Sequence, residues 1–144
     1  MRTGFMAAAC AIFILPLLLY PALAQNNPVM RNFSATYQTC VKEADISDPA
    51  IVDCNYAEVE AQDVSLNDVY RQVMTKMAGP QRENVRLALR DAERAWVTYM
   101  KAECDYRYAK EEGGSLARRE HSYCLLNMTY DRVEVLRGIL KSAN

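Results

Sequence analysis

The sequence predicts an all-α protein, an up-down-up bundle of three long helices with a short N-terminal segment, stapled by two disulfides. Three observations predict this fold. After residue 24, glycine and proline are sparse and fall mostly at the borders of periodic stretches, apolar residues recur at helical spacing, and four cysteines are available for bonding. Sparse turn residues favour a few long helices over many short strands.

The first 24 residues have the pattern of a cleaved signal peptide. Arg2 precedes the apolar run 5–20, and small residues stand before Gln25, where cleavage is expected. The run is too short to serve comfortably as a membrane span. Cys10 lies inside it without the upstream leucine of a lipoprotein signal, which disfavours lipid anchoring. We therefore expect an exported protein, periplasmic or secreted, with no membrane span after cleavage.

The rest of the chain is the length of one domain. Removing 24 residues from 144 leaves 120, enough for one hydrophobic core. We expect a flexible leader over 25–33 and a single helical domain over 34–144. The remaining 16 Lys and Arg against 18 Asp and Glu give a net charge of −2, which argues against nucleic acid as a partner. The oligomeric state is left open.

The first elements are marked by caps. Ser34 is placed to cap a short helix, and Asp48 followed by Pro49 is placed to start a long one. The next break is Gly79-Pro80, so one helix over 49–78 is expected. Its apolar stripe comprises Ile51, Val52, Tyr56, Val59, Leu66, Val69, Tyr70, Val73 and Met77.

Two further periodic stretches follow. The second long helix runs from Gly79-Pro80 to Gly113-Gly114, and the third occupies the C-terminal part of the chain. Their apolar sets are Val85, Leu89, Ala92, Trp96, Tyr99 and Met100, and then Leu125, Met128, Val135, Leu136, Ile139 and Leu140. Short connections between long amphipathic helices imply antiparallel neighbours.

The four cysteines after residue 24 favour disulfides over a metal site. Their wide spacing and the single histidine lack paired-ligand geometry. Three pairings are possible. Cys40 and Cys54 flank the turn before the first long helix, and Cys104 and Cys124 flank the Gly-Gly turn, so these two bonds are favoured. A redox function would prefer closely spaced, electropositive thiols.

Arg132 is the most informative charged residue. The period of the third helix places it at the centre of an apolar face, where an unpaired guanidinium would be costly. Asp63 and Glu103 each lie where they could form an ion pair with Arg132, and the sequence does not show which of the two does so. Hydrogen-bonding partners are expected from Gln62, Asn67 and Thr129. We interpret the cluster either as a structural ion pair that fixes the helix register or as a catalytic or ligand-binding charge cluster.

The sequence lacks the motifs that identify common classes of enzyme. The sequence has no G-x-S-x-G elbow, no phosphate loop and no HExxH pair, and its one histidine, His121, reads as a partly exposed helix residue. Asp63 and Glu103 are paired carboxylates in principle, but no cleft is predicted between them. We expect no catalytic residues, no metal and no cofactor.

The Gly-Gly turn is the first of two candidate surfaces for contact with a partner, and the acidic face described next is the second. We interpret the segment Gly113-Gly114-Ser115 either as the turn that ends one helix and starts the next, or as a loop that enters a partner's cleft. Tyr106, Tyr108 and Tyr123 would surround it.

Charge along the chain is uneven. Residues 43–68 hold eight acids and no Lys or Arg, with Asp53, Glu60 and Asp68 opposite the apolar stripe. Such a face is either simply solvated or attracts a basic partner and speeds its approach. A basic ridge on the second helix, spaced by four, is expected to face solvent or to pair between helices; it comprises Arg82, Arg86, Arg90 and Arg94.

The order and spacing of certain residues resemble the LprI-type lysozyme inhibitor family of small exported bacterial proteins. The residues are Cys40, Cys54, Asp63, Leu66-Asn67, Tyr70, the stretch Leu89 to Trp96, Cys104, Gly113-Gly114-Ser115, Cys124, Thr129, Arg132 and Leu136. They cover 40–140. Two departures occur, since Glu93 stands where the family usually has Gln, and Met100-Lys101 replaces the usual Arg-Asp. The resemblance implies an α-helical periplasmic domain, with lysozyme inhibition in some members.

The leading hypothesis is therefore an exported protein-binding domain, a lysozyme inhibitor-like protein whose partner is lysozyme or another envelope protein. The alternative is a structural or stress-related envelope protein without inhibitory activity. A third hypothesis, a glycan-cleaving enzyme, rests only on the Asp63 and Glu103 carboxylates.

Overall fold

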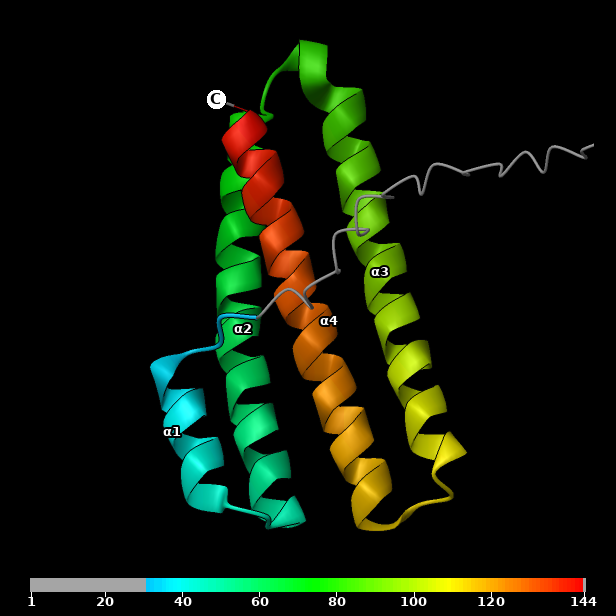
Figure 1. The fold of residues 1–144 in the computed structure, drawn as a ribbon. Helices are drawn as coiled ribbons and strands as arrows, with labels where there is room; N and C mark the ends of the chain where they lie inside the picture. Colours follow the sequence, from blue (N-terminus) through cyan, green and yellow to red (C-terminus); the bar gives the residue numbers. More distant parts are fainter. Residues whose placement is uncertain (1–30, 144) are drawn as a thin grey trace, which may run out of the picture. The chain divides into compact units, whose positions relative to one another are not determined.

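The computed structural model describes residues 31–143, which contain four α-helices and no strand. The helices are α1 (Ala35–Ala44), α2 (Asp48–Lys76), α3 (Glu83–Lys110) and α4 (Gly114–Ser142), with a 3-10 turn at Pro80–Arg82 before α3. The three long helices run up, down and up, as predicted, and α1 adds a fourth helix to that description (Figure 1). The expected signal peptide, 1–24, and most of the expected leader lie outside the described residues.

The helix boundaries follow local signals. The Ser34 side chain accepts a hydrogen bond from the Tyr37 amide, which caps α1 as predicted. α2 begins one residue earlier than predicted, because Ser47 takes the N-cap position and Asp48 is the first helical residue. Asp48 instead pairs with Arg119 across the bundle, at 2.8 Å between Oδ1 and Nη1. Gly79, at φ 130°, interrupts the helical conformation between α2 and α3.

The principal interface of the bundle joins α2 and α4, which run in the same direction (Figure 1). Val69 and Val73 of α2 are buried against Leu136 of α4, and partly buried residues of α2, α3 and α4 pack around them. α3 packs mainly on α4, so the consecutive helices α2 and α3 are not the closely packed antiparallel neighbours that their short connection predicted.

The apolar face of α4 is wider than predicted because this helix is packed on two sides. Leu126 and Val133, absent from the predicted set, are buried, whereas Val135, a predicted member, is about half exposed. On α3 the opposite holds. Val85 and Tyr99 were predicted to be apolar-face residues and are exposed, and Cys104 is the one buried residue of that helix.

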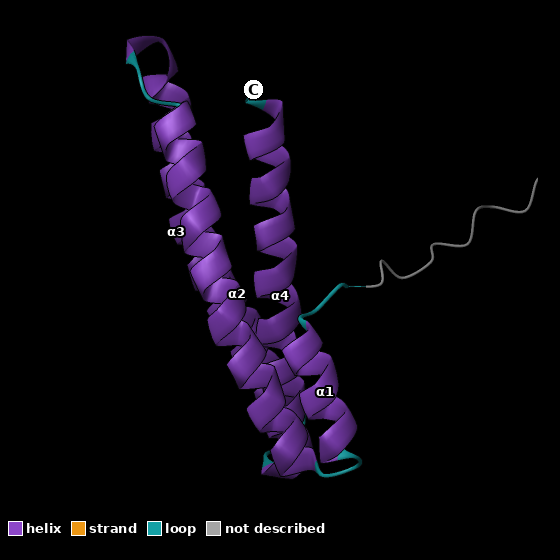
Figure 2. Ribbon diagram, turned by 90° about the vertical axis from the view of Figure 1, so that its left-hand side faces the viewer, coloured by secondary structure: helices purple, strands orange, loops and turns teal. Residues whose placement is uncertain are grey.

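α1 lies beside the lower half of α2 (Figures 1 and 2). The segment before it also contacts the bundle. Arg31 makes a two-pronged ion pair with Asp131 of α4, at 2.9 and 2.8 Å, and the Phe33 ring packs edge-on against Tyr37 and Tyr130. Residues 31–33 of the expected flexible leader are therefore held against α1 and α4.

Candidate protein-binding surface

Two turns lie at the same end of the bundle, the α1–α2 turn at 45–47 and the α3–α4 turn at 111–113 (Figure 1). A disulfide stands close to each. Cys40 is bonded to Cys54, with Cα atoms 5.8 Å apart, and Cys104 is bonded to Cys124, with Cα atoms 5.5 Å apart. Both predicted pairings are confirmed. We call this part of the molecule, comprising the two turns and the two disulfides, the disulfide-braced end.

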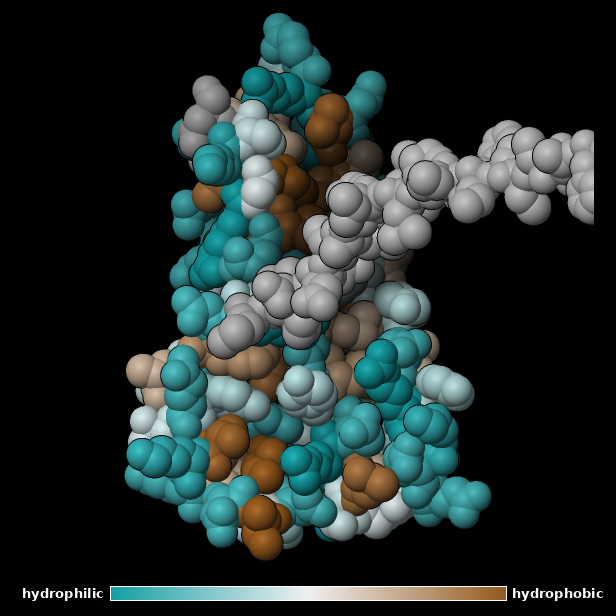
Figure 3. All heavy atoms as spheres, viewed as in Figure 1, coloured by the Kyte–Doolittle hydropathy of each residue, from teal (hydrophilic) through white to brown (hydrophobic). Residues whose placement is uncertain are grey.

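The disulfide-braced end exposes large apolar and aromatic side chains. Ile46, at the tip of the α1–α2 turn, is 88% exposed, and Leu116 in the first turn of α4 is about half exposed. Tyr106, Tyr108 and Tyr123 are also exposed and flank the Cys104–Cys124 bond in sequence. Hydrophobic side chains appear on this end in the space-filling view (Figure 3). Apolar and aromatic groups held on a cross-linked backbone are suited to contact another protein.

The Gly-Gly turn is built from consecutive residues with a positive backbone φ. Glu112, Gly113 and Gly114 all have positive φ, at 54°, 93° and 87°, and Glu111 rather than a glycine is the C-cap of α3. A Cβ at either glycine would meet no atom within 4 Å, so strain at positive φ, and not crowding, is what disfavours a larger residue there. Ser115 is exposed in the first turn of α4.

His121 joins three helices near this end. Its Nδ1 lies 3.1 Å from the Tyr56 hydroxyl of α2, and its Nε2 lies 3.6 Å from Asp105 of α3. The ring of Tyr108 stands edge-on at 6.1 Å. The hydrogen bond from Lys101, with a smaller contribution from His121, lowers the pKa of Asp105. The predicted partly exposed histidine is thus also a bridge between helices, which spacing along one helix does not reveal.

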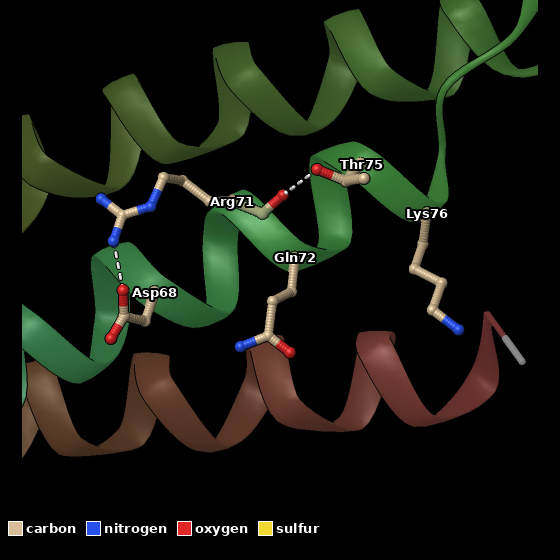
Figure 4. Close-up of a pocket in the computed structure, with 5 residues that line it drawn as sticks. All are labelled: Asp68, Arg71, Gln72, Thr75 and Lys76. Atoms are coloured by element: carbon tan, nitrogen blue, oxygen red, sulfur yellow. Dashed lines mark hydrogen bonds and ion pairs between the residues drawn. The ribbon is translucent and has the colours of Figure 1, made fainter.

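The predicted acidic face lies on α2, where Asp53, Glu60 and Asp68 are exposed. Asp68 forms an ion pair with Arg71 one turn away, so its charge is partly neutralised (Figure 4). Both side chains line a shallow hollow of about 420 Å³ together with Gln72, Thr75 and Lys76, and all five belong to α2. The face therefore offers Asp53 and Glu60 more freely than Asp68.

The prediction that either Asp63 or Glu103 pairs with Arg132 was wrong. Its guanidinium pairs with Glu93 of α3, with Nε 3.0 Å from Oε1 and a second contact through Nη2. The two side chains are only 17% and 12% exposed. Neither Asp63 nor Glu103 pairs with Arg132. Glu103 pairs with Arg107 on its own helix, and partial desolvation raises the pKa of Asp63.

The expected hydrogen-bonding partners also lie elsewhere. Asn67 donates to the Asp63 carbonyl within α2, at 2.9 Å, and Gln62 donates to Glu58, at 2.8 Å. The buried Thr129 hydroxyl contacts the Met100 sulfur at 3.7 Å. What lies beside Arg132 is Trp96, whose ring centroid is 5.9 Å from the guanidinium carbon.

Two buried polar residues of α2 were not found from the sequence. Glu58, 3% exposed, accepts hydrogen bonds from the Ser34 amide, the Ser34 hydroxyl and Gln62. Asn55 accepts from the Tyr37 hydroxyl, at 2.9 Å, and donates to Ser122 of α4, at 3.0 Å. These contacts tie α1, α2 and α4 together. Polar residues inside the predicted apolar stripe were the available signal.

Residues 31–143 contain no group of three or more His, Cys, Asp or Glu that could hold a metal ion. In the same part of the chain, no helix has the length and apolar character needed to cross a membrane.

Comparison with known proteins gives one family and one relative. The profile of the family described as lysozyme inhibitor LprI matches residues 40–136. An uncharacterized protein of Rhizobium meliloti (strain 1021) is 29% identical over 99 residues, covering 62% of this chain and 71% of the relative. No solved structure matches. Disulfides and this family match fit an exported protein.

Proposed function

The chain belongs to the LprI lysozyme inhibitor family, and on that premise we propose that it is an exported domain that inhibits a lysozyme by binding to it. The contact surface in this proposal is the disulfide-braced end, with the Gly113-Gly114-Ser115 turn entering or covering the substrate cleft of the enzyme. Inhibition of this kind needs shape and rigidity rather than catalytic groups.

The observation that carries the proposal is the exposure of apolar side chains on a cross-linked end. Ile46 lies in the α1–α2 turn, Leu116 lies in α4 just after the α3–α4 turn, and a disulfide stands close to each turn. The Asp48–Arg119 ion pair links the first part of α2 to the first part of α4. A surface that is already ordered loses little conformational entropy when it binds. The nearby tyrosines add contact area at a low entropy cost.

The acidic face of α2 has a separate role in the proposal. Asp53 and Glu60 are exposed charges that accelerate the approach of a basic enzyme without being part of the final contact. Charges of this kind act chiefly on the association rate, and salt screens them within about 10 Å at 0.1 M ionic strength.

Binding kinetics on immobilised animal lysozyme separate the two roles. Ser115→Trp and Leu116→Asp should raise the dissociation rate at least tenfold. Asp53→Asn combined with Glu60→Gln should instead slow association several-fold and flatten its dependence on salt. Lys141→Ala, at the far end of α4, is the matched control and should change neither rate.

Circular dichroism of each variant excludes loss of folding. If the turn variants dissociate at the wild-type rate, the disulfide-braced end is not the contact surface.

A further inference from the structure

α3 is under-buried for a helix of its length. It has 28 residues and one buried side chain, Cys104, whereas α2 and α4 each have seven. The reason is its packing, since α3 lies mainly against α4 and not against α2. An amphipathic helix with one partner instead of two leaves part of its apolar surface open.

The open side of α3 faces a groove shared with α2. The groove has a volume of about 430 Å³, and its apolar lining comes from Leu66 and Tyr70 of α2 and from Trp96 and Val97 of α3. Val97 is 52% exposed. Glu93 also lines the groove, but its carboxylate forms an ion pair with Arg132 of α4. The floor is therefore largely apolar and aromatic.

The α3 rim of the groove is cationic. Arg90 and Arg94 line it, and they belong to the basic ridge that the sequence places on this helix. Both lie near Asp91, at 3.0 and 3.9 Å, so two guanidiniums share one carboxylate. Arg86, one turn earlier, pairs with Glu83. Over 82–94 the ridge has four arginines, and its paired carboxylates are Glu83 and Asp91, which leaves an excess of positive charge.

We propose that this groove binds an acidic amphipathic helix of a partner protein. Apolar side chains of the partner would cover Trp96, Val97, Leu66 and Tyr70, and carboxylates along one edge would pair with Arg90 and Arg94. A helix in this position would form a four-helix arrangement with α2, α3 and α4 and would bury the open side of α3. The groove is separate from the disulfide-braced end, so this binding does not depend on lysozyme inhibition.

The test uses the only tryptophan of the chain, Trp96, as the reporter. The probe is an 18-residue peptide of leucine and glutamate with leucines at helical spacing, titrated into the exported, oxidised protein. We expect a saturable blue shift of the Trp96 emission, because the peptide removes water from the ring. Arg90→Glu with Arg94→Glu should weaken binding at least tenfold, and Val97→Asp should abolish it.

Three controls make the outcome decisive. Arg118→Glu reverses an exposed charge outside the groove and should leave the affinity unchanged. A peptide with lysine in place of glutamate should not bind. Inhibition of lysozyme by the Arg90 and Arg94 variant should equal that of the wild type. Equal binding of the two peptides, an unaffected arginine variant or unchanged emission overturns the proposal. Emission that changes on dilution of the protein alone would overturn it in favour of a second copy.

Discussion

Arg132 of α4 and Glu93 of α3, 39 residues apart in sequence, form an ion pair that is largely shielded from solvent. The same guanidinium lies over Trp96, so one side chain contacts both an anion and an aromatic ring of α3. Because Cys104 is the single buried residue of α3, this shielded ion pair adds to the few buried groups that α3 presents to α4.

Loss of Glu93 should therefore destabilise the protein more than loss of Arg132. Each change leaves the other member of the shielded pair without its partner. Glu93→Ala leaves a guanidinium, which cannot lose its charge, at a cost of about 3 kcal/mol, whereas the carboxyl group left by Arg132→Met can be neutralised by a proton. Glu93→Gln keeps the shape and should fall between them. Urea midpoints measure the order. Asp63→Ala and Glu103→Ala are controls, and a larger loss in either than in Glu93→Ala would contradict the pairing.

The Cys104–Cys124 bond should govern the order of α3. Replacing both cysteines by alanine opens a loop of sequence separation 20 and should cost about 3 kcal/mol. It also truncates the one buried side chain of α3, so amide hydrogen exchange should accelerate in α3 and much less in α2.

The matched control is the Cys40 and Cys54 double alanine variant. It should lower stability by a similar amount but leave α3 protected, because that bond joins α1 and α2. Faster exchange of α3 in both variants would contradict a local role for Cys104–Cys124.

Glu58 should hold the start of α1 in place. Glu58→Gln removes the charge that accepts the Ser34 amide and hydroxyl, and a hydrogen bond to a buried charged group contributes about 1.5–3 kcal/mol. We expect a destabilisation in that range and loss of amide protection in α1. Glu60→Gln, two residues away and exposed, is the control. Equal effects of the two changes would show that the buried network does not fix α1.

Asp63 should make stability depend on pH in an unusual direction. Desolvation raises the pKa of this carboxyl above its ordinary value of 3.8, so the folded protein holds the proton more tightly than the unfolded chain. The stabilisation is complete below the unfolded pKa and is lost as pH rises through the folded pKa. Asp63→Asn should therefore raise the melting temperature at pH 7 and lose this advantage below pH 3.8. Asp53→Asn is the control, and equal pH profiles of the two variants would contradict the cause.

Local signals were sufficient for much of the fold. Ser34, Gly79-Pro80 and the Gly-Gly turn mark helix boundaries through backbone chemistry that acts within a few residues. The disulfide pairs followed from the same reasoning, because each pair flanks one turn.

Contacts between helices were harder to predict from the sequence than helix boundaries. Period alone placed Arg132 on a buried face but could not choose its partner, because the choice depends on how α3 is rotated and displaced against α4. The parallel packing of α2 on α4 has the same origin, since loop length sets direction along the chain but not which long helix lies at the centre. The role of Glu58 was not predicted because its donors are Ser34, which caps α1, and Gln62, one turn further along its own helix.

The most direct test of the account is the rate at which a basic animal lysozyme clears a cell-wall suspension in the presence of the oxidised protein. The account predicts a rate that falls with increasing protein and reaches a plateau near one equivalent at micromolar concentration. It predicts no effect after both disulfides are reduced, because the disulfide-braced end then loses its order. An unchanged rate at micromolar concentrations of folded, oxidised protein would contradict it.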